Sequence, residues 1–360
     1  MLDRNNYAII MAGGIGSRFW PISTKSTPKQ FLDIMGVGKT LIRQTFERFA
    51  NIIPVENIYI VTNEVYGSLV FSEIPELGES QVLLEPSAKN TATCIAYASY
   101  KIKKANPFAV CIVAPSDHLV LNESAFLEVV ARGMAFCKPN PQLLCIGIKP
   151  HRPDTGYGYI QFDENNDADI FNVKTFTEKP NQELAQQFIE SGDFLWNAGI
   201  FIWNVETITD SFEKHIPEMH NLFSSISNRL NTISESNAIE EIYPICTNIS
   251  IDYGLLEKAE NVMVIPGDFG WSDIGTWASL YDVFAKDEQD NAINGEMVRT
   301  YNTSGCMISV PKDKLVVLNG IKNLIVVESD KVLLISDIAK EQEVKQLVTN
   351  IKLEYGERFT

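Results

Sequence analysis

The chain has 360 residues, which is enough for about two domains of typical size. Hydrophobic residues make up 45% and charged residues 21%, close to globular averages, which argues against disordered and fibrous classes. Asp and Glu number 46 against 30 Lys and Arg, so the net charge is −16. Because such a chain repels phosphate backbones and anionic lipid, we expect no nucleic-acid or membrane-surface binding. A phosphate-bearing ligand would need local basic groups, backbone N–H groups or a metal.

The sequence has no run of about 18 uninterrupted apolar residues, so we predict no membrane span. The polar N-terminus is followed by an apolar run at residues 8–12, too short for a secretory signal. The six cysteines are scattered without a Cys-x-x-Cys pair, and most lie inside apolar runs, which predicts reduced core thiols. We therefore expect a cytoplasmic protein.

Short apolar runs alternate with amphipathic stretches through the first half of the chain. Predicted strands cover residues 7–12, 57–62, 81–84, 109–114 and 142–148. Predicted helices cover residues 41–49, 91–103 and 124–136. This alternation predicts an α/β fold, a Rossmann-like, mostly parallel sheet with helices on both faces.

Short β-rich runs dominate the chain after about residue 291, and a predicted helix at residues 338–353 follows them. The polar segment 286–291 resembles a linker, so we predict a domain at 1–290 and a small β-rich, β-helix-like domain at 291–360 that ends in a helix. A packed, partly apolar appendage of this kind is a reasonable dimer contact, and we expect a homodimer.

Two familiar phosphate motifs fail on their spacing. Gly38-Lys39-Thr40 ends like a P-loop, but the residue five positions before Gly38 is Asp33 rather than glycine. Gly14-Ile15-Gly16 begins like a dinucleotide fingerprint, but its third glycine position holds Phe19.

A glycine-rich loop follows the first predicted strand. Gly13, Gly14 and Gly16 allow backbone N–H groups to approach an anion closely. Arg18 and Lys29 add cations, one as a planar fork suited to phosphate oxygens and the other as a point charge. An ordinary turn beside surface basic residues is the alternative, but the combination favours a phosphate site.

These residues carry a family resemblance. The segment 13–21, continued by Pro28-Lys29-Gln30-Phe31, resembles the motif of sugar-phosphate nucleotidylyltransferases. Within that family, Phe19-Trp20-Pro21 and Pro28-Lys29-Gln30-Phe31 are most similar to the branch that transfers guanylyl groups to mannose 1-phosphate. Further blocks occur in the family's order at residues 85–92, 115–118, 155–160, 176–180, 196–201, 250–253 and 270–275. The resemblance implies that residues 1–290 form the nucleotidyltransferase catalytic domain.

Two carboxylates are candidate metal ligands. Asp117 follows the predicted strand 109–114 at its C-terminal end, where open parallel sheets bind ligands, and a carboxylate there suits Mg²⁺. A helix cap is the alternative role for Asp117. The resemblance implies that Asp273 is the second ligand, with a plain turn residue between Gly270 and Gly275 as the alternative. We therefore expect Mg²⁺ as the cofactor.

The resemblance also implies a set of nucleotide contacts. They are Ala12, Gly13, Gly14, Gly16, Ser17, Glu85, Asn90 and Ser116. We predict that Glu85, with Asn90, selects guanine, because one carboxylate can accept both the N1–H and N2–H₂ donors of that base. Glu85 precedes Pro86, so a plain turn residue is the alternative.

On the sugar side, the resemblance implies that Lys179 holds the sugar 1-phosphate, that Glu178 binds hydroxyls, and that Gly156 and Tyr159 line the site. Asn197 offers an amide donor and acceptor suited to a sugar hydroxyl. Adjacent strand residues point to opposite faces, so Glu178 and Lys179 serve one pocket only if the chain bends, which Pro180 favours. A solvated Glu-Lys pair is the alternative.

The expected reaction is an in-line displacement in which mannose 1-phosphate attacks the α-phosphorus of GTP. Lys179 would position the attacking phosphate, while Arg18 and Lys29 would neutralise the departing pyrophosphate. Two alternatives remain. One is uridylyl, thymidylyl or adenylyl transfer to glucose 1-phosphate, and the other is a non-catalytic regulatory subunit that binds nucleotide sugar.

Overall fold

The computed structural model describes residues 2–163 and 169–360, and it divides the chain into two compact units. The first unit contains residues up to 13, 45–116 and 120–271; the second contains residues 14–44, 117–119 and 272–360. Each unit therefore combines segments that are far apart in the sequence. The predicted division at 290/291 stays a prediction.

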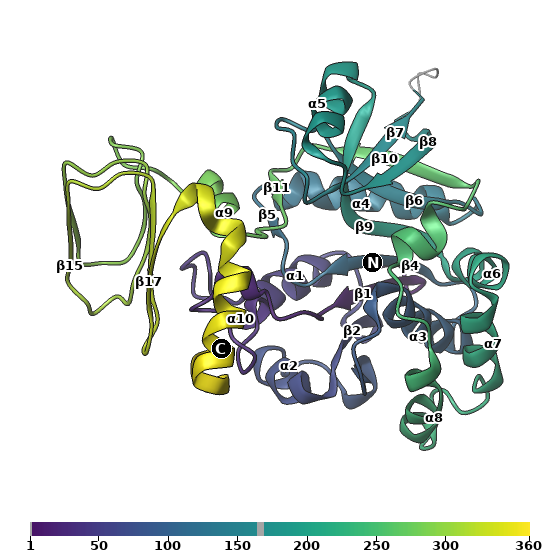
Figure 1. The fold of residues 1–360 in the computed structure, drawn as a ribbon. Coiled ribbons are helices and arrows are strands. Elements are labelled where there is room, and N and C mark those ends of the chain that lie inside the picture. Colours follow the sequence, from purple (N-terminus) through teal and green to yellow (C-terminus); the bar gives the residue numbers. More distant parts are fainter. Residues whose placement is uncertain (1, 164–168) are drawn as a thin grey trace. The chain divides into compact units, whose positions relative to one another are not determined.

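A nine-stranded sheet forms the centre of the first unit, in the order β3-β2-β1-β4-β9-β6-β10-β8-β7 (Figure 1). Its strands are β1 (Asn6–Met11), β2 (Ile58–Asn63), β3 (Val82–Glu85), β4 (Val110–Pro115), β6 (Leu143–Ile148), β7 (Gly158–Phe162), β8 (Phe171–Glu178), β9 (Phe194–Asn204) and β10 (Val262–Gly267). The short strands β5 (Leu119–Val120) and β11 (Trp271–Ser272) lie where the chain crosses between the units.

The sheet is mostly parallel, as predicted, because seven of its nine strands run in one direction and only β8 and β9 run against them. Strands β3, β2, β1 and β4 run parallel to one another, as do β6 and β10. Strand β9 runs antiparallel to β4, β6 and β7, and β8 runs antiparallel to β7 and β10. Alternating strands and helices predict that strands exist, but they do not fix the direction of a strand inserted between two others.

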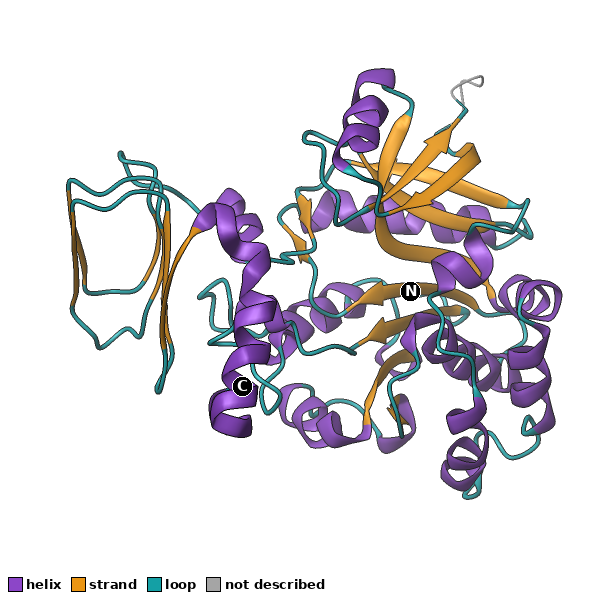
Figure 2. Cartoon of the chain, in the orientation of Figure 1, coloured by secondary structure: helices purple, strands orange, loops and turns teal. Residues whose placement is uncertain are grey.

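Helices cover both faces of the sheet, as predicted (Figure 2). The helices of this unit are α1 (Leu41–Ala50), whose first residues belong to the second unit, α2 (Gly67–Glu73), α3 (Asn90–Ala105), α4 (Glu123–Cys137), α5 (Gln182–Ser191), α6 (Val205–His215), α7 (Pro217–Ser225) and α8 (Glu235–Ile242). On one face, Gly133 of α4 lies so close to Ile202 of β9 that an added Cβ would be 2.5 Å from its Cδ1. On the other face, α3 and α6 pack over the neighbouring side chains of Phe201 and Trp203.

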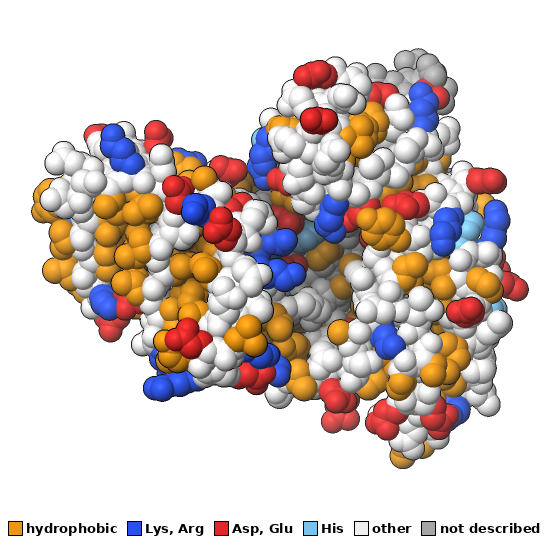
Figure 3. Space-filling view, in the orientation of Figure 1, with side chains coloured by type: hydrophobic (Ala, Val, Ile, Leu, Met, Phe, Trp, Pro, Cys, Tyr) orange, Lys and Arg blue, Asp and Glu red, His pale blue; other side chains and the backbone are white. Residues whose placement is uncertain are grey.

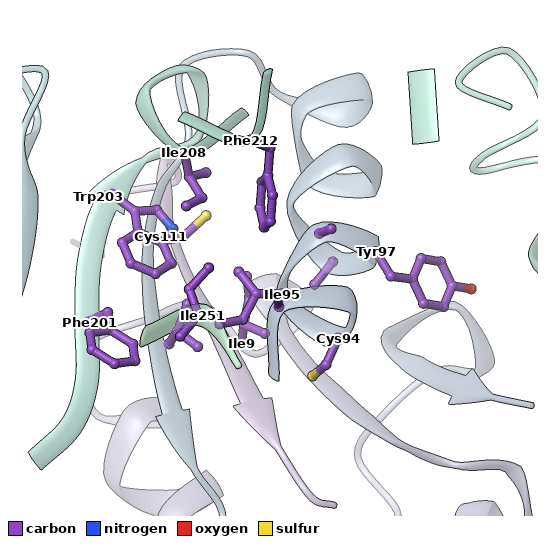
Figure 4. Close-up of a cluster of buried hydrophobic side chains, with 14 of the residues drawn as sticks. Ile9, Cys94, Ile95, Tyr97, Cys111, Phe201, Trp203, Ile208, Phe212 and Ile251 are labelled. Atoms are coloured by element: carbon purple, nitrogen blue, oxygen red, sulfur yellow. The ribbon is translucent and has the colours of Figure 1, made fainter. Parts of the chain in front are cut away.

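The main core of this unit lies between α3, α6 and the sheet. Figure 4 shows Ile95 of α3 with Ile208 and Phe212 of α6 beside Cys111 of β4 and Trp203 of β9. Because both faces are covered, the central strands carry continuous apolar runs rather than an alternating pattern. All six cysteines are buried free thiols, as predicted.

The second unit combines the glycine-rich loop with the C-terminal strands and helices. Its elements are α9 (Trp277–Val283), β12 (Ala292–Asn294), β13 (Val298–Tyr301), β14 (Met307–Ser309), β15 (Val316–Asn319), β16 (Leu324–Glu328), β17 (Leu333–Asp337) and α10 (Val344–Tyr355). Strands β12, β14 and β16 pair in parallel, β17 joins them antiparallel, and β13 pairs in parallel with β15. The expected β-rich part that ends in a helix is confirmed, whereas its description as β-helix-like stays a prediction.

Two observations bear on the surface and on membranes. The C-terminal strands expose hydrophobic side chains, visible in Figure 3, which include Val317, Leu333 and Ile335 at 56–58% exposure. Within residues 2–163 and 169–360, no helix has the length and apolar character that a bilayer crossing requires.

Candidate active site

The glycine-rich loop begins where β1 ends. Ala12 is buried, and its carbonyl accepts a hydrogen bond from Thr62 Oγ1 at 2.9 Å. Gly13 and Gly14 are exposed, and nothing lies within 4 Å of where their Cβ atoms would be. Gly16 has φ 72°, and an added Cβ would be 2.5 Å from Lys29 Cβ. Glycine at position 16 therefore gives the loop its turn and leaves room for Lys29.

Lys29 brings the two predicted metal ligands into one cluster. Its side chain is almost completely buried, and its Nζ lies 2.9 Å from Asp117 Oδ2. The same Nζ donates a hydrogen bond to the main-chain carbonyl of Asp273 at 2.6 Å. Burial opposes ionisation of Asp117, but the Lys29 ammonium outweighs it and holds the pKa of that carboxyl below its ordinary value. Asp117 is thus a carboxylate at neutral pH.

Asp273 lies in a tight turn. Its Oδ1 accepts a hydrogen bond from Gly275 N at 2.9 Å, and an added Cβ on Gly275 would be 2.7 Å from its Oδ2. Phe19 supports this cluster, because its ring packs at 4.9 Å from the Trp277 ring and at 5.7 Å from Lys29 Nζ. Asp273 therefore fills the turn role and also lies beside Lys29.

The donor set of this cluster fits Mg²⁺. Mg²⁺ prefers oxygen ligands and is commonly held by one or two carboxylates together with substrate phosphates. Asp117 contacts the Lys29 ammonium through its carboxylate, and Asp273 contacts it through its main-chain carbonyl. Among the described residues, no group of three or more His, Cys, Asp and Glu side chains forms a complete metal cage.

A second cluster gathers most of the predicted sugar-binding residues in the first unit. Lys179 Nζ lies 2.7 Å from Glu178 Oε1. Lys179 has φ 48°, a conformation that non-glycine residues rarely adopt and that often marks functional sites. The predicted bend is therefore present, and it lets two neighbouring side chains meet. Although burial opposes it, the Glu178 carboxylate raises the pKa of Lys179 above its ordinary value.

Asn197 lies beside this pair with both ends of its amide engaged. Its Nδ2 donates to Asp252 Oδ1 at 2.9 Å, and its Oδ1 accepts from Gly199 N at 3.0 Å. Gly158, which pairs with Glu178 across β7 and β8, leaves the space that these side chains occupy: an added Cβ would be 2.4 Å from Glu178 Oε2 and 3.4 Å from Asn197 Cβ. A larger residue at 158 would therefore displace the Glu178 carboxylate from its present position.

Glu85 is buried at the end of β3. Its Oε1 accepts a hydrogen bond from Tyr243 Oη at 2.5 Å. Burial raises the pKa of Glu85, and the hydrogen bond from Tyr243 opposes that rise. A carboxylate oxygen has more than one acceptor position, so this contact leaves Glu85 able to accept further hydrogen bonds.

The remaining predicted residues differ in exposure and in the groups that they contact. Arg18 and Asn90 are exposed, and Asn90 has φ 66°. Ser116 is buried, and its N donates to Met11 O at 2.9 Å. Tyr159 is fully buried, and its hydroxyl donates to the Asp154 carbonyl at 2.9 Å. The remaining two are partly or fully exposed: Ser17 lies in a 3₁₀ turn (Ser17–Phe19), and Gly156 N donates to Asp154 Oδ1 at 2.8 Å.

Three residues of these clusters were not predicted from the sequence. Asp252 lies within a recognisable block, 250–253, but that block carried no assigned role. The only sequence feature that pointed to Gly158 is its position two residues after Gly156 in the block 155–160. Tyr243 follows no recognisable motif, so only the structure places it against Glu85.

The family model described as Nucleotidyl transferase matches residues 7–290. The chain is 34% identical over 352 residues to a putative mannose-1-phosphate guanylyltransferase of Vibrio cholerae, covering 96% of this chain and 74% of the relative. It is 33% identical over 364 residues to the mannose-1-phosphate guanylyltransferase of Escherichia coli, covering 98% of this chain and 74% of that protein.

Solved structures show the same relationship. A crystal structure described as a mannose-1-phosphate geranyltransferase of Thermus thermophilus matches with a TM-score of 0.87 and 30% identity, covering 97% of this chain and 99% of that one. A mannose-6-phosphate isomerase structure from Helicobacter pylori matches with a TM-score of 0.60 and 25% identity, covering 74% of this chain and 99% of that one. With a family match over residues 7–290 and relatives above 30% identity over nearly all of its length, this chain belongs to the nucleotidyl transferase family.

Proposed function

We propose that this protein transfers GMP from GTP to α-D-mannose 1-phosphate and releases GDP-mannose and pyrophosphate. The observation that carries the chemistry is the cluster in which Lys29 Nζ contacts both Asp117 and Asp273. The substrate choice rests on relatives named mannose-1-phosphate guanylyltransferase that align with nearly the whole chain.

The proposed reaction is an in-line displacement. A phosphate oxygen of mannose 1-phosphate forms a bond to the α-phosphorus of GTP, and the bond from that phosphorus to the bridging oxygen of the β-phosphate breaks. Pyrophosphate leaves with that electron pair. Because the attacking phosphate is already an anion at neutral pH, the step needs no general base, and the main barrier is repulsion between anions.

Basic residues counter that repulsion. Lys179 binds the phosphate of the sugar, and Glu178 and Asn197 bind its hydroxyls. Lys29, Arg18 and the N–H groups of the glycine-rich loop stabilise the charge that develops on the departing pyrophosphate. Asp117 and Asp273 would hold Mg²⁺, which when bound supplies further charge neutralisation to phosphate oxygens.

A substrate panel tests the proposal directly. Pyrophosphate release is measured with mannose 1-phosphate or glucose 1-phosphate, each combined with GTP, ATP, UTP or dTTP, in the presence of Mg²⁺. The proposal requires GTP with mannose 1-phosphate to give the highest kcat/KM. A preference for glucose 1-phosphate with another nucleotide would support the neighbouring transferases, and binding without turnover would support a regulatory subunit.

The metal site has its own test. EDTA should abolish pyrophosphate release, and added Mg²⁺ should restore it. Asp117→Asn should need roughly tenfold more Mg²⁺ for half-maximal rate, because the ion loses a charged ligand. Asp3→Asn, which removes a carboxylate that pairs with Lys138, serves as the control and should leave the Mg²⁺ dependence unchanged.

Base selection is tested at Glu85. Glu85→Gln replaces one acceptor oxygen by a donor NH₂ group, which cannot pair with both guanine donors. We expect kcat/KM with GTP to fall by about tenfold or more relative to ATP and UTP. An unchanged preference for GTP would remove Glu85 from base recognition while leaving the proposed reaction in place.

A further inference from the structure

The cluster around Glu178 contains one carboxylate to which no function has been given. Asp252 begins a single π-helical turn (Asp252–Leu256), a rare local structure that often occurs at functional sites. It contacts the amide of Asn197, 55 residues earlier in the sequence, at 2.9 Å. Asp252 therefore reaches the sugar-binding cluster from an element outside the sheet.

The two hydrogen bonds of Asn197 define how its amide is oriented. An amide that donates through Nδ2 to a carboxylate and accepts through Oδ1 from a backbone N–H cannot be rotated by 180° without placing two acceptors, and two donors, against each other. One N–H and one lone pair remain for a ligand. Asp252 and Gly199 together thus determine which hydroxyl geometry Asn197 can bind.

The surrounding charges show that Asp252 belongs to the same cluster. Burial and the neighbouring Glu178 carboxylate raise the pKa of Asp252 to about 6, while its contact with Asn197 and the Lys179 ammonium oppose that rise. Asp252 therefore contacts the Asn197 amide directly and is close enough to Glu178 and Lys179 to be affected by their charges.

We propose that Asp252 is a positioning residue for sugar recognition, which holds the Asn197 amide in the one orientation that binds the hydroxyls of the hexose 1-phosphate. This inference rests on the proposed function for the identity of the sugar, but not for the contact itself. It predicts that loss of Asp252 weakens sugar binding through Asn197 and leaves nucleotide binding unaffected.

A double-mutant cycle tests the proposal. Asp252→Ala should raise KM for mannose 1-phosphate by roughly tenfold or more and change KM for GTP by less than about twofold, because a hydrogen bond to a charged acceptor is lost only on the sugar side. In an Asn197→Ala background, the same Asp252→Ala change should have no further effect on KM. If the two effects add instead, Asp252 does not act through Asn197 and the proposal is overturned.

Two further variants separate positioning from a structural role. Asp252→Asn keeps an oxygen that accepts from Asn197, so KM for the sugar should stay within about threefold of the unmodified protein. Glu260→Ala removes an exposed carboxylate a few residues after the turn and should leave both KM values unchanged. A rise in KM with Glu260→Ala equal to that with Asp252→Ala would show a general disturbance of this segment and would contradict the proposal.

A spectroscopic measurement tests the role of Asp252 without depending on which sugar the protein uses. The side-chain NH₂ signals of Asn197, identified in ¹⁵N-labelled protein by their absence in Asn197→Ala, should shift strongly in Asp252→Ala and much less in Asp252→Asn, which keeps the hydrogen bond. This result needs no substrate, so a protein that acts on another sugar would fail the substrate panel and still show it. Unchanged NH₂ signals in Asp252→Ala would overturn the proposal whatever the substrate.

Discussion

Lys29 is the residue whose buried charge most directly connects fold and chemistry. It is 3% exposed and contacts Asp117 and Asp273. Because the group is buried, bulk water cannot take over its contacts when the charge is removed. We predict that Lys29→Met, which keeps the length of the side chain but removes the charge, lowers kcat by roughly 100-fold or more. Lys25→Met is the matched control in the same loop, because Lys25 is exposed and pairs with exposed Glu357, and kcat should not change. Equal losses in the two variants would contradict a specific role for Lys29.

At Asp252 the structure predicts a dependence of stability on pH. With a pKa of about 6, against an ordinary value of 3.8, the folded state holds a proton between those pH values that the unfolded state has lost. The free energy of unfolding should therefore fall as pH rises through this window, by up to about 3 kcal/mol.

The corresponding measurement uses urea unfolding of the Asp252→Asn variant. Asn carries no charge, so the variant should be more stable than the unmodified protein at pH 8, and the gap should close as pH falls towards 4. Asp210→Asn, an exposed carboxylate on α6, should show no such gap at either pH. A variant less stable at pH 8 would mean that the Asp252 carboxylate stabilises the fold, contrary to the predicted sign.

At the scale of elements, the C-terminal helix supports the loop that carries Arg18. Val344 of α10 is fully buried in a cluster with Trp20 and Leu334, and Trp20 Nε1 donates to the Phe359 carbonyl at 2.6 Å. Trp20 is two residues after Arg18 in the sequence. The helix therefore packs against the segment that follows the glycine-rich loop and is more than a tail.

Removing side-chain volume from α10 tests this role. Val344→Ala deletes two buried methyl groups and should lower the free energy of unfolding by about 2 kcal/mol. Leu353→Ala, on the same helix but 82% exposed, should change it by less than about 0.5 kcal/mol. Urea unfolding followed by tryptophan fluorescence distinguishes them, and equal effects would argue against packing of α10 through Val344.

At the scale of the whole molecule, we propose that the protein forms a homodimer through its C-terminal strands. Leu333 and Ile335 of the edge strand β17 are 56% and 58% exposed, and apolar side chains gathered on one surface commonly mark an interface. Sedimentation should give about twice the mass of one chain. Ile335→Asp should give single chains because it buries a charge in the contact, whereas Ile233→Asp, at a fully exposed position of the first unit, should not. A single-chain mass for the unmodified protein would reject the dimer.

The sequence alone determined the local structure and the chemical types of the candidate residues. The apolar runs at 7–12, 109–114 and 142–148 correspond closely to β1, β4 and β6, because covering both faces of a strand requires a continuous apolar segment. The glycine-rich loop with Arg18 and Lys29 was predicted from spacing and charge, since glycine and basic residues are the groups that an anion requires.

Only the tertiary structure decided which distant residues meet. Lys29 contacts Asp273 across 244 residues, and Asn197 contacts Asp252 across 55, and no periodicity within a short window encodes such pairs. The direction of β9 was likewise invisible, because its apolar pattern is the same whether it runs parallel or antiparallel to β4 and β6. Local patterns specify elements, whereas their partners and directions depend on how the whole chain buries its apolar faces and satisfies its backbone hydrogen bonds.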